Sequence, residues 1–117
     1  PEIKVVGPMA HDQLFRHASV IIHHGGAGTT ASALHAGRPQ VIIPHIADQD
    51  FWAAEVRRLG AGLKLRERHW PERLPRAVDE AETRGDLNRA AGAAAEALQT
   101  ENGPAAAVQV LEQYVAE

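Results

Sequence analysis

Residues 18–30 read Ala-Ser-Val-Ile-Ile-His-His-Gly-Gly-Ala-Gly-Thr-Thr, an apolar run that leads directly into a glycine-rich segment. The β-branched residues at 20–22 are typical of a buried strand, and the glycines that follow are typical of a sharp turn. Thr29 and Thr30 are suited to capping a helix start. A strand that turns into a helix N-terminus leaves backbone N–H groups unpaired and favours negative charge there. The stretch therefore predicts a strand–turn–helix unit that holds a phosphate group.

Outward from this turn, short apolar runs alternate with longer mixed segments over the first two thirds of the chain. The runs predicted as strands are Ile3–Val6, Val20–His23, Val41–Ile43 and, as a fourth candidate, Ala61–Leu65. The segments predicted as helices are His11–His17, Thr29–Ala36 and Asp48–Leu59, the last two closed by Gly37 and Gly60. This alternation is typical of βαβ units. We therefore expect an α/β fold, a Rossmann-like parallel sheet of three to four strands with flanking helices.

The last third of the chain is predicted to be helical. Pro71 suits the first turn of a helix whose inward residues are Leu74, Ala77, Val78 and Ala81. A second helix fits Asp86–Thr100, and a third opens at Pro104. We see no repeat and no linker, so residues 1–117 are expected to form a single domain. Because so small a sheet would leave one edge bare, we expect this domain to be part of a larger one.

Composition excludes several function classes. The net charge of −3 gives no basic field for nucleic acid, and the chain has no cysteine for disulfides or thiolate zinc sites. No apolar run approaches the length of a membrane span, and the first residues do not resemble a signal peptide. A cytoplasmic protein is the expectation that remains.

Within the glycine-rich turn, Gly25 and Gly26 allow a sharp bend and a close approach of backbone to ligand, and Gly28 falls in the first helical turn. Adjacent residues of a strand point to opposite faces, so His23 and His24 cannot both face one ligand. His24 is nearer the turn and is the better candidate for donating to a phosphate oxygen.

Three other interpretations remain open for this turn. It can be a tight packing turn without a ligand. His23, His24 and His45 can be considered as a metal site, although no carboxylate stands at ligand spacing. Residues 26–31 also fit the G-x-G-x-x-A dinucleotide fingerprint, with Asp48 about 20 residues on. In that fingerprint, however, the acidic residue ends the next strand, whereas Asp48 is placed like a helix N-cap.

A second cluster, residues 44–49, follows the predicted strand Val41–Ile43. In open α/β sheets ligands bind outside the carboxyl ends of the strands, so this cluster and the glycine turn are expected at one edge. The Asp48 carboxylate and Gln49 amide suit the hydroxyl groups of a sugar. Phe51 and Trp52 are expected in the core, with Trp52, Val56 and Leu59 on one helical face.

These residues together resemble the donor-binding region of GT-B glycosyltransferases that use nucleotide sugars, in the bacterial natural-product and sterol branches. The segments that carry the resemblance are His23–Thr30, Gly37–Gln40, Pro44, Asp48–Gln49 and Leu59–Gly62. The resemblance implies that the chain is part of the C-terminal domain of such an enzyme. It implies that the diphosphate is bound by His24, Gly25, Gly26, Ala27, Gly28 and Thr29, and the sugar by Asp48 and Gln49.

Further expectations come from the same resemblance. Met9, Ala10 and His11 would lie near the base, and Ser32 stands where some branches place a glutamate for the ribose. Neither a metal nor another cofactor is implied. The general base and the acceptor site belong to an N-terminal domain that this chain does not contain, so no catalytic residue is expected here.

The sequence thus predicts the donor half of an enzyme that transfers a hexose or deoxyhexose. The donor would be a UDP- or TDP-sugar, and the acceptor a hydroxyl group of a small lipophilic molecule. Neither nucleic acid nor a membrane span is expected among its partners. The alternatives are a non-catalytic nucleotide-binding module and a Rossmann dinucleotide-binding fragment.

Overall fold

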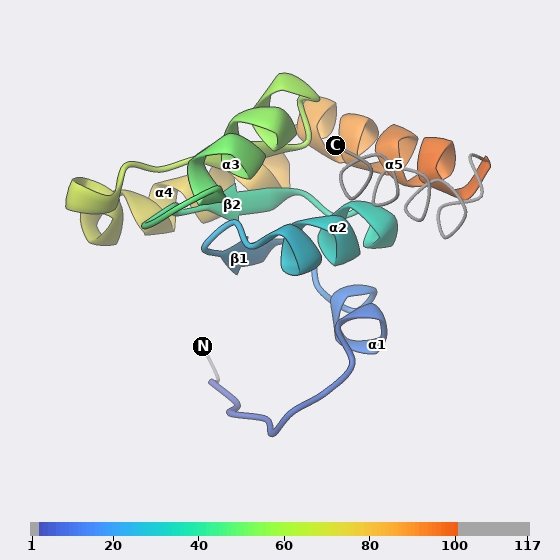
Figure 1. Ribbon diagram of the computed structural model, residues 1–117, viewed down its shortest axis with the longest axis horizontal. Helices are drawn as coiled ribbons and strands as arrows, with labels where there is room; N and C mark the ends of the chain where they lie inside the picture. The colour runs from blue at the N-terminus through green and yellow to red at the C-terminus, as the bar shows by residue number, and fades with distance from the viewer. Residues whose placement is uncertain (1–2, 101–117) are drawn as a thin grey trace, which may run out of the picture.

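A parallel three-stranded sheet lies at the centre of the computed structural model, which describes residues 3–100 (Figure 1). The strands β1 (Ile21–His23), β2 (Gln40–Ile42) and β3 (Gly62–Lys64) lie side by side in chain order. Helix α2 (Ala27–Ala36) joins β1 to β2, and helix α3 (Gln49–Arg58) joins β2 to β3. The predicted βαβ arrangement, including the fourth strand candidate at Ala61–Leu65, is confirmed.

The central strand β2 is buried on both sides, which explains its continuous apolar sequence. Val41 and Ile42 are wholly buried and, as neighbours on a strand, pack on opposite faces. Ile42 packs with Ala53 and Val56 of α3 and with Ala91 of α5 (Gly85–Thr100). Val41 packs with Ala77, Ala81 and Leu87, the first two from α4 (Trp70–Thr83). Helices therefore cover both faces of the sheet.

Residues 67–100 are almost entirely helical, as predicted for this part of the chain. A 3₁₀ turn, η1 (Glu67–His69), leads into α4, whose first turn contains Pro71. Helix α5 follows after Arg84 and contacts α2. The predicted third helix, which opens at Pro104, lies outside the described residues.

The predicted strand Ile3–Val6 is wrong. This segment forms no strand, its three apolar side chains are more than half exposed, and it runs apart from the sheet (Figure 1). A strand requires a neighbour for its backbone hydrogen bonds, and none lies beside this segment within residues 3–100. Helix α1 (His11–Phe15) then returns the chain to the body, where Phe15 packs on Ile21 and Ala33.

Gly37 and Gly60 end α2 and α3 in the predicted left-handed conformation, with φ of 71° and 76°. Of the helices that the structure describes, none is both long and apolar enough to cross a membrane.

Candidate functional site

Two loops meet at the carboxyl edge of the sheet. Residues 24–26 follow β1 and enter α2, while residues 43–48 follow β2 and enter α3. The strands are parallel and in register, with His23 opposite Ile42, and the Ile43 N–H donates to the His23 carbonyl at 2.9 Å. The predicted phosphate turn and the predicted sugar cluster are therefore brought together.

Gly25 is the point where these two loops touch. Its φ of 99° is disfavoured for residues with a side chain, as the predicted sharp bend requires. A Cβ at this position would lie 2.8 Å from the Gln49 carbonyl oxygen and 3.0 Å from Ile42 Cγ2. Gly26 differs, because its φ is an ordinary −61° and a Cβ there would meet nothing within 4 Å. The missing side chain of Gly25 thus allows the two loops to pack together, whereas a Cβ at Gly26 would contact no other residue.

Helix α2 begins at Ala27, two residues earlier than predicted. The Gly26 carbonyl accepts from the Thr30 N–H at 2.9 Å, so the N–H groups of residues 27–29 precede the helical hydrogen bonds. No side chain caps this end, and the expected threonine caps are wrong because Thr29 and Thr30 fall inside the helix. These N–H groups, with the helix dipole behind them, form a site suited to an anion. A Cβ at Gly28 would stand in open space above them.

His23 shapes the turn from inside. Its Nδ1 accepts from the Gly25 N–H at 2.9 Å, so the proton is on Nε2, which donates to Oε1 of the buried Gln40 at 2.5 Å. Burial lowers the pKa of His23 below 6.5; the bond to Gln40 opposes this, and the charges of His24 and His11 add to it. His23 is accordingly a neutral, structural histidine, and His24 is the exposed one.

His24 stands on the surface next to His45, which follows β2. The two rings meet edge to face, with centroids 4.7 Å apart and an angle of 67° between the planes. The sequence placed His45 in the cluster at residues 44–49 and among the residues of a possible metal site. Within residues 3–100 no three histidine or acidic side chains are grouped so as to hold a metal ion.

Asp48 and Gln49 lie at the start of α3, and each has one hydrogen-bonding atom already engaged. Asp48 Oδ2 accepts from the Trp52 indole Nε1 at 2.9 Å, and the carboxylate does not cap the helix. Gln49 Oε1 accepts from the N–H groups of His45 at 2.8 Å and Ile46 at 3.0 Å. Asp48 Oδ1 and the Gln49 amide nitrogen are left to meet a ligand. Asp48 stands beyond the end of β2, so the dinucleotide fingerprint is not fulfilled.

The aromatic prediction for α3 is partly wrong. Phe51 is 57% exposed and Leu59 is 44% exposed, whereas Val56 is buried as expected. The stripe of α3 that packs on the sheet contains Ala53 and Val56, so Phe51 and Leu59 fall outside it. Trp52 is half-buried, and its indole is directed to Asp48. The loop before α3 also holds Ala47 at φ 54°, a left-handed conformation that is uncommon for alanine.

The residues expected near the base are distributed over the segment before α1, α1 itself and α2. Met9 and Ala10 are exposed in the extended segment before α1. His11 stacks on Phe15 with ring centroids 4.8 Å apart, and its charge contributes to the lowered pKa of His23. Ser32 is half-buried on α2. Of these four residues, His11 is thus placed near the turn.

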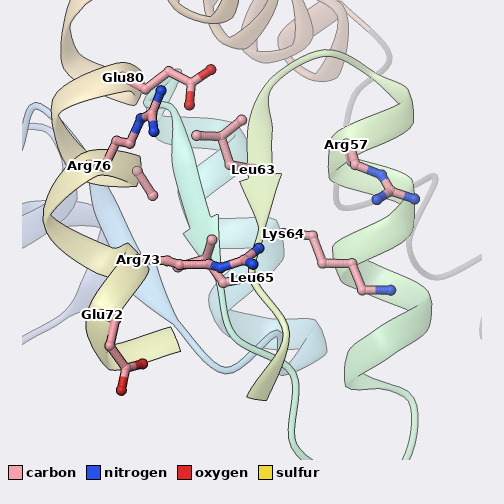
Figure 2. Close-up of a pocket in the computed structure, with 9 residues that line it drawn as sticks. Arg57, Leu63, Lys64, Leu65, Glu72, Arg73, Arg76 and Glu80 are labelled. Atoms are coloured by element: carbon pink, nitrogen blue, oxygen red, sulfur yellow. The ribbon is translucent and has the colours of Figure 1, made fainter. Parts of the chain in front are cut away.

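Two hollows in the surface lie close to the site, and the second reaches the loop that follows β2. One of them has a volume of about 530 Å³. Figure 2 shows that it lies between β3 and α4, with basic and acidic side chains around Leu63 and Leu65. Its charged lining residues are Arg57, Lys64, Glu72, Arg73, Arg76 and Glu80. A second hollow of about 410 Å³ includes Pro44 and Asp50, and Asp50 forms an ion pair with Lys64.

Comparison with known proteins identifies the family. The model of the family described as "Erythromycin biosynthesis protein CIII-like, C-terminal domain" matches residues 1–114, and the chain belongs to this family. It is a GT-B glycosyltransferase C-terminal domain by fold, and the predicted resemblance is confirmed.

Individual relatives are glycosyltransferases. The chain is 38% identical to a sterol 3-beta-glucosyltransferase of Komagataella phaffii over 96% of its own length and 9% of the relative's. It is 47% identical to the vancomycin aglycone glucosyltransferase of Amycolatopsis orientalis over 50% of its length and 14% of the relative's. The solved structure of the spinosyn rhamnosyltransferase SpnG matches with a TM-score of 0.80 and 25% identity, over 93% of this chain and 30% of that one. The chain thus spans a small part of the enzymes it resembles.

Proposed function

We propose that this chain forms the donor-binding half-site of a glycosyltransferase, within one domain that includes residues 1–117. The whole enzyme would move a hexose or deoxyhexose from a UDP- or TDP-sugar to a hydroxyl group of a small lipophilic acceptor. The observation that carries the proposal is the meeting of the anion-binding turn with the Asp48–Gln49 loop, where Gly25 packs on the Gln49 backbone.

Each part of a nucleotide sugar finds a matching group at this edge. The N–H groups at residues 27–29 and the exposed imidazole of His24 suit the two phosphates, with the Thr29 hydroxyl beside them. Asp48 Oδ1 accepts from a sugar hydroxyl and the Gln49 amide nitrogen donates to another. We assign the nucleoside contacts to Met9, Ala10, His11 and Ser32, and the support for this is the placement of His11 near the turn. SpnG has also been solved with thymidine diphosphate, and that structure matches this chain with a TM-score of 0.72.

The chemistry of this half-site is the stabilisation of a leaving group. Negative charge grows on the diphosphate as the glycosidic bond breaks, and the end of α2 presents fixed donors to that charge without reorganisation. His24 adds one more donor. We assign the groups at this edge to donor binding, and we assign the base that takes the acceptor's proton, with the acceptor pocket, to a part of the enzyme outside residues 1–117. The chain alone is expected to bind donor without turnover.

The proposal is tested by titrating the 117-residue chain with UDP, TDP and NAD in a calorimeter. Binding of UDP or TDP, weakened about tenfold or more in His24→Ala, is the expected result, since a charge-assisted hydrogen bond is lost. The control is His35→Ala, because His35 is exposed on the last turn of the same helix. Binding of NAD without a response to either diphosphate would overturn the proposal.

The sugar contacts are tested separately. In Asp48→Ala the affinity for a UDP- or TDP-sugar should fall while the affinity for the bare diphosphate is kept. Equal losses for both ligands would remove Asp48 from the sugar site.

A further inference from the structure

The rings of His45 and His24 contact each other directly, an arrangement that the sequence did not predict. His24 follows β1 and His45 follows β2, and because these strands are neighbours the two side chains come off one edge. The Nδ1 atoms of the two rings are 3.2 Å apart. Nδ1 of His45 is also 2.7 Å from the Ile43 carbonyl oxygen.

These two contacts fix the protons on both rings. A carbonyl oxygen only accepts, so His45 Nδ1 must carry a proton and donate it to Ile43. The same N–H faces His24 Nδ1, which must then be the acceptor, because two N–H groups would oppose each other at 3.2 Å. A neutral His24 therefore carries its proton on Nε2. The neutral His45 carries it on Nδ1, the less favoured position for a histidine in water.

We propose that His45 is a positioning residue for His24. It holds the His24 ring edge-on and in the Nε2–H form, so that its one donor is directed away from His45 and is ready for a phosphate oxygen. The ligand in this statement rests on the proposed function, whereas the arrangement of the two rings does not.

The backbone of His45 is itself held in place. Its N–H and that of Ile46 donate to Gln49 Oε1, and Ala47 turns the loop in a left-handed conformation. Gln49 therefore fixes the backbone of His45, and the His45 ring fixes His24. The proposed sugar residue and the proposed phosphate residue are joined by a continuous series of hydrogen bonds.

Two variants separate the positioning role from mere bulk. His45→Asn places an amide N–H where Nδ1–H stands and preserves the donor. His45→Phe keeps a ring of similar size and removes the donor. His45 is exposed, so both variants are expected to fold, and circular dichroism checks this.

The direct readout is the tautomer of each ring in the ¹⁵N-labelled 117-residue chain, above the pH at which the histidines are charged. Long-range ¹H–¹⁵N correlation spectra distinguish a protonated ring nitrogen from an unprotonated one, and His24→Ala and His45→Asn assign the signals. We expect a protonated Nδ1 on His45 and a protonated Nε2 on His24. A protonated Nε2 on His45, or a protonated Nδ1 on His24, overturns the proposal.

The consequence for binding is measured by titration with TDP. In His45→Phe the His24 side chain is no longer held in place. It must then be immobilised when TDP binds, so binding should weaken about 3- to 10-fold. His45→Asn should stay within about twofold of the wild type. Equal weakening in both variants contradicts the positioning role. Absence of TDP and UDP binding in the wild type, with the expected tautomers, refutes the proposed function and leaves the ring arrangement established.

Discussion

Replacing Gly25 by alanine should destabilise the fold severely, although it adds a single methyl group. The new Cβ would lie 2.8 Å from the Gln49 carbonyl oxygen and 3.0 Å from Ile42 Cγ2. The first partner is backbone at the start of α3, and the second belongs to a wholly buried residue of the central strand. Neither can move aside like the end of a flexible side chain.

The magnitude follows from two costs. Holding a non-glycine residue at φ 99° costs about 1–3 kcal/mol. Crowding a packed region costs another 1–3 kcal/mol or so. Alanine also reduces the conformational entropy of the unfolded chain, which offsets about 0.4–1 kcal/mol of these costs. The net loss is about 1–5.5 kcal/mol, centred on about 3 kcal/mol, a large fraction of the roughly 5–15 kcal/mol that stabilises a small domain.

Urea unfolding followed by circular dichroism measures this loss. With a slope of about 1–3 kcal/mol per molar, the midpoint should fall by about 1 M or more. The control is Gly28→Ala, because a Cβ there meets nothing within 4 Å and lies in the first turn of α2. It should be neutral or stabilising by up to about 1 kcal/mol. If Gly25→Ala unfolds at the same urea concentration as the Gly28 variant, the packing argument is wrong.

Three further predictions concern single contacts. Trp52→Phe removes the indole donor to Asp48 and should weaken binding of a TDP- or UDP-sugar about 2- to 10-fold, with the bare diphosphate unaffected in the same calorimeter. Burial lowers the pKa of His23 below 6.5 in the folded chain. The unfolded chain therefore takes up the proton first, and the free energy of unfolding decreases as the pH falls below about 6.5. Urea midpoints at about pH 7.5 and 5.5 should differ less in His23→Gln than in the wild type. Arg84 lowers the pKa of Asp86 from 3.8 to about 2, so this carboxylate stabilises the fold above pH 3.8 and ceases to do so as pH falls toward 2. Asp86→Asn should reduce the change of the urea midpoint with pH in this range. An unchanged pH dependence would show that the ion pair is screened by solvent.

The parts of the fold that were predictable are those set by local sequence. The β-branched runs at residues 20–22 and 41–43 are long enough to indicate buried strands, and Gly37 and Gly60 mark helix ends that the structure confirms. The turn at Gly25 was also predictable, because its sequence requires a bend between a strand and a helix.

The parts that failed depend on partners far away in the chain. Ile3–Val6 has the composition of a strand, but composition does not supply a neighbour for its hydrogen bonds. Phe51 was expected in the core because large aromatic side chains are usually buried, but the stripe of α3 that faces the sheet contains Ala53 and Val56. In both cases the residues are apolar, as the prediction assumed, but no other part of the described structure packs against them closely enough to bury them.

Within the candidate site, the sequence likewise indicated residues of a local pattern and missed a contact between two distant segments. His24, Asp48 and Gln49 belong to a recognisable pattern. His45 gains its place only because β1 and β2 are neighbours, and the sequence offers one signal for this: both histidines follow closely on the ends of predicted strands. The threonine caps failed because a helix start is uncertain by one or two residues.

The amide of Gln49 has a fixed polarity, which bears on the choice of sugar. Two backbone N–H groups hold Oε1, so the side chain cannot turn over and presents only its NH₂ group to a ligand. The sugar position that faces it must therefore offer a lone pair. A hydroxyl group does so, whereas a protonated amino group there would bring positive hydrogens against positive hydrogens, and a deoxy position would leave the amide without a partner. For any donor bound as proposed, the Gln49 amide would repel a protonated amino group at the ring position that it faces. Asp48 would decide which groups are accepted at the position that it contacts.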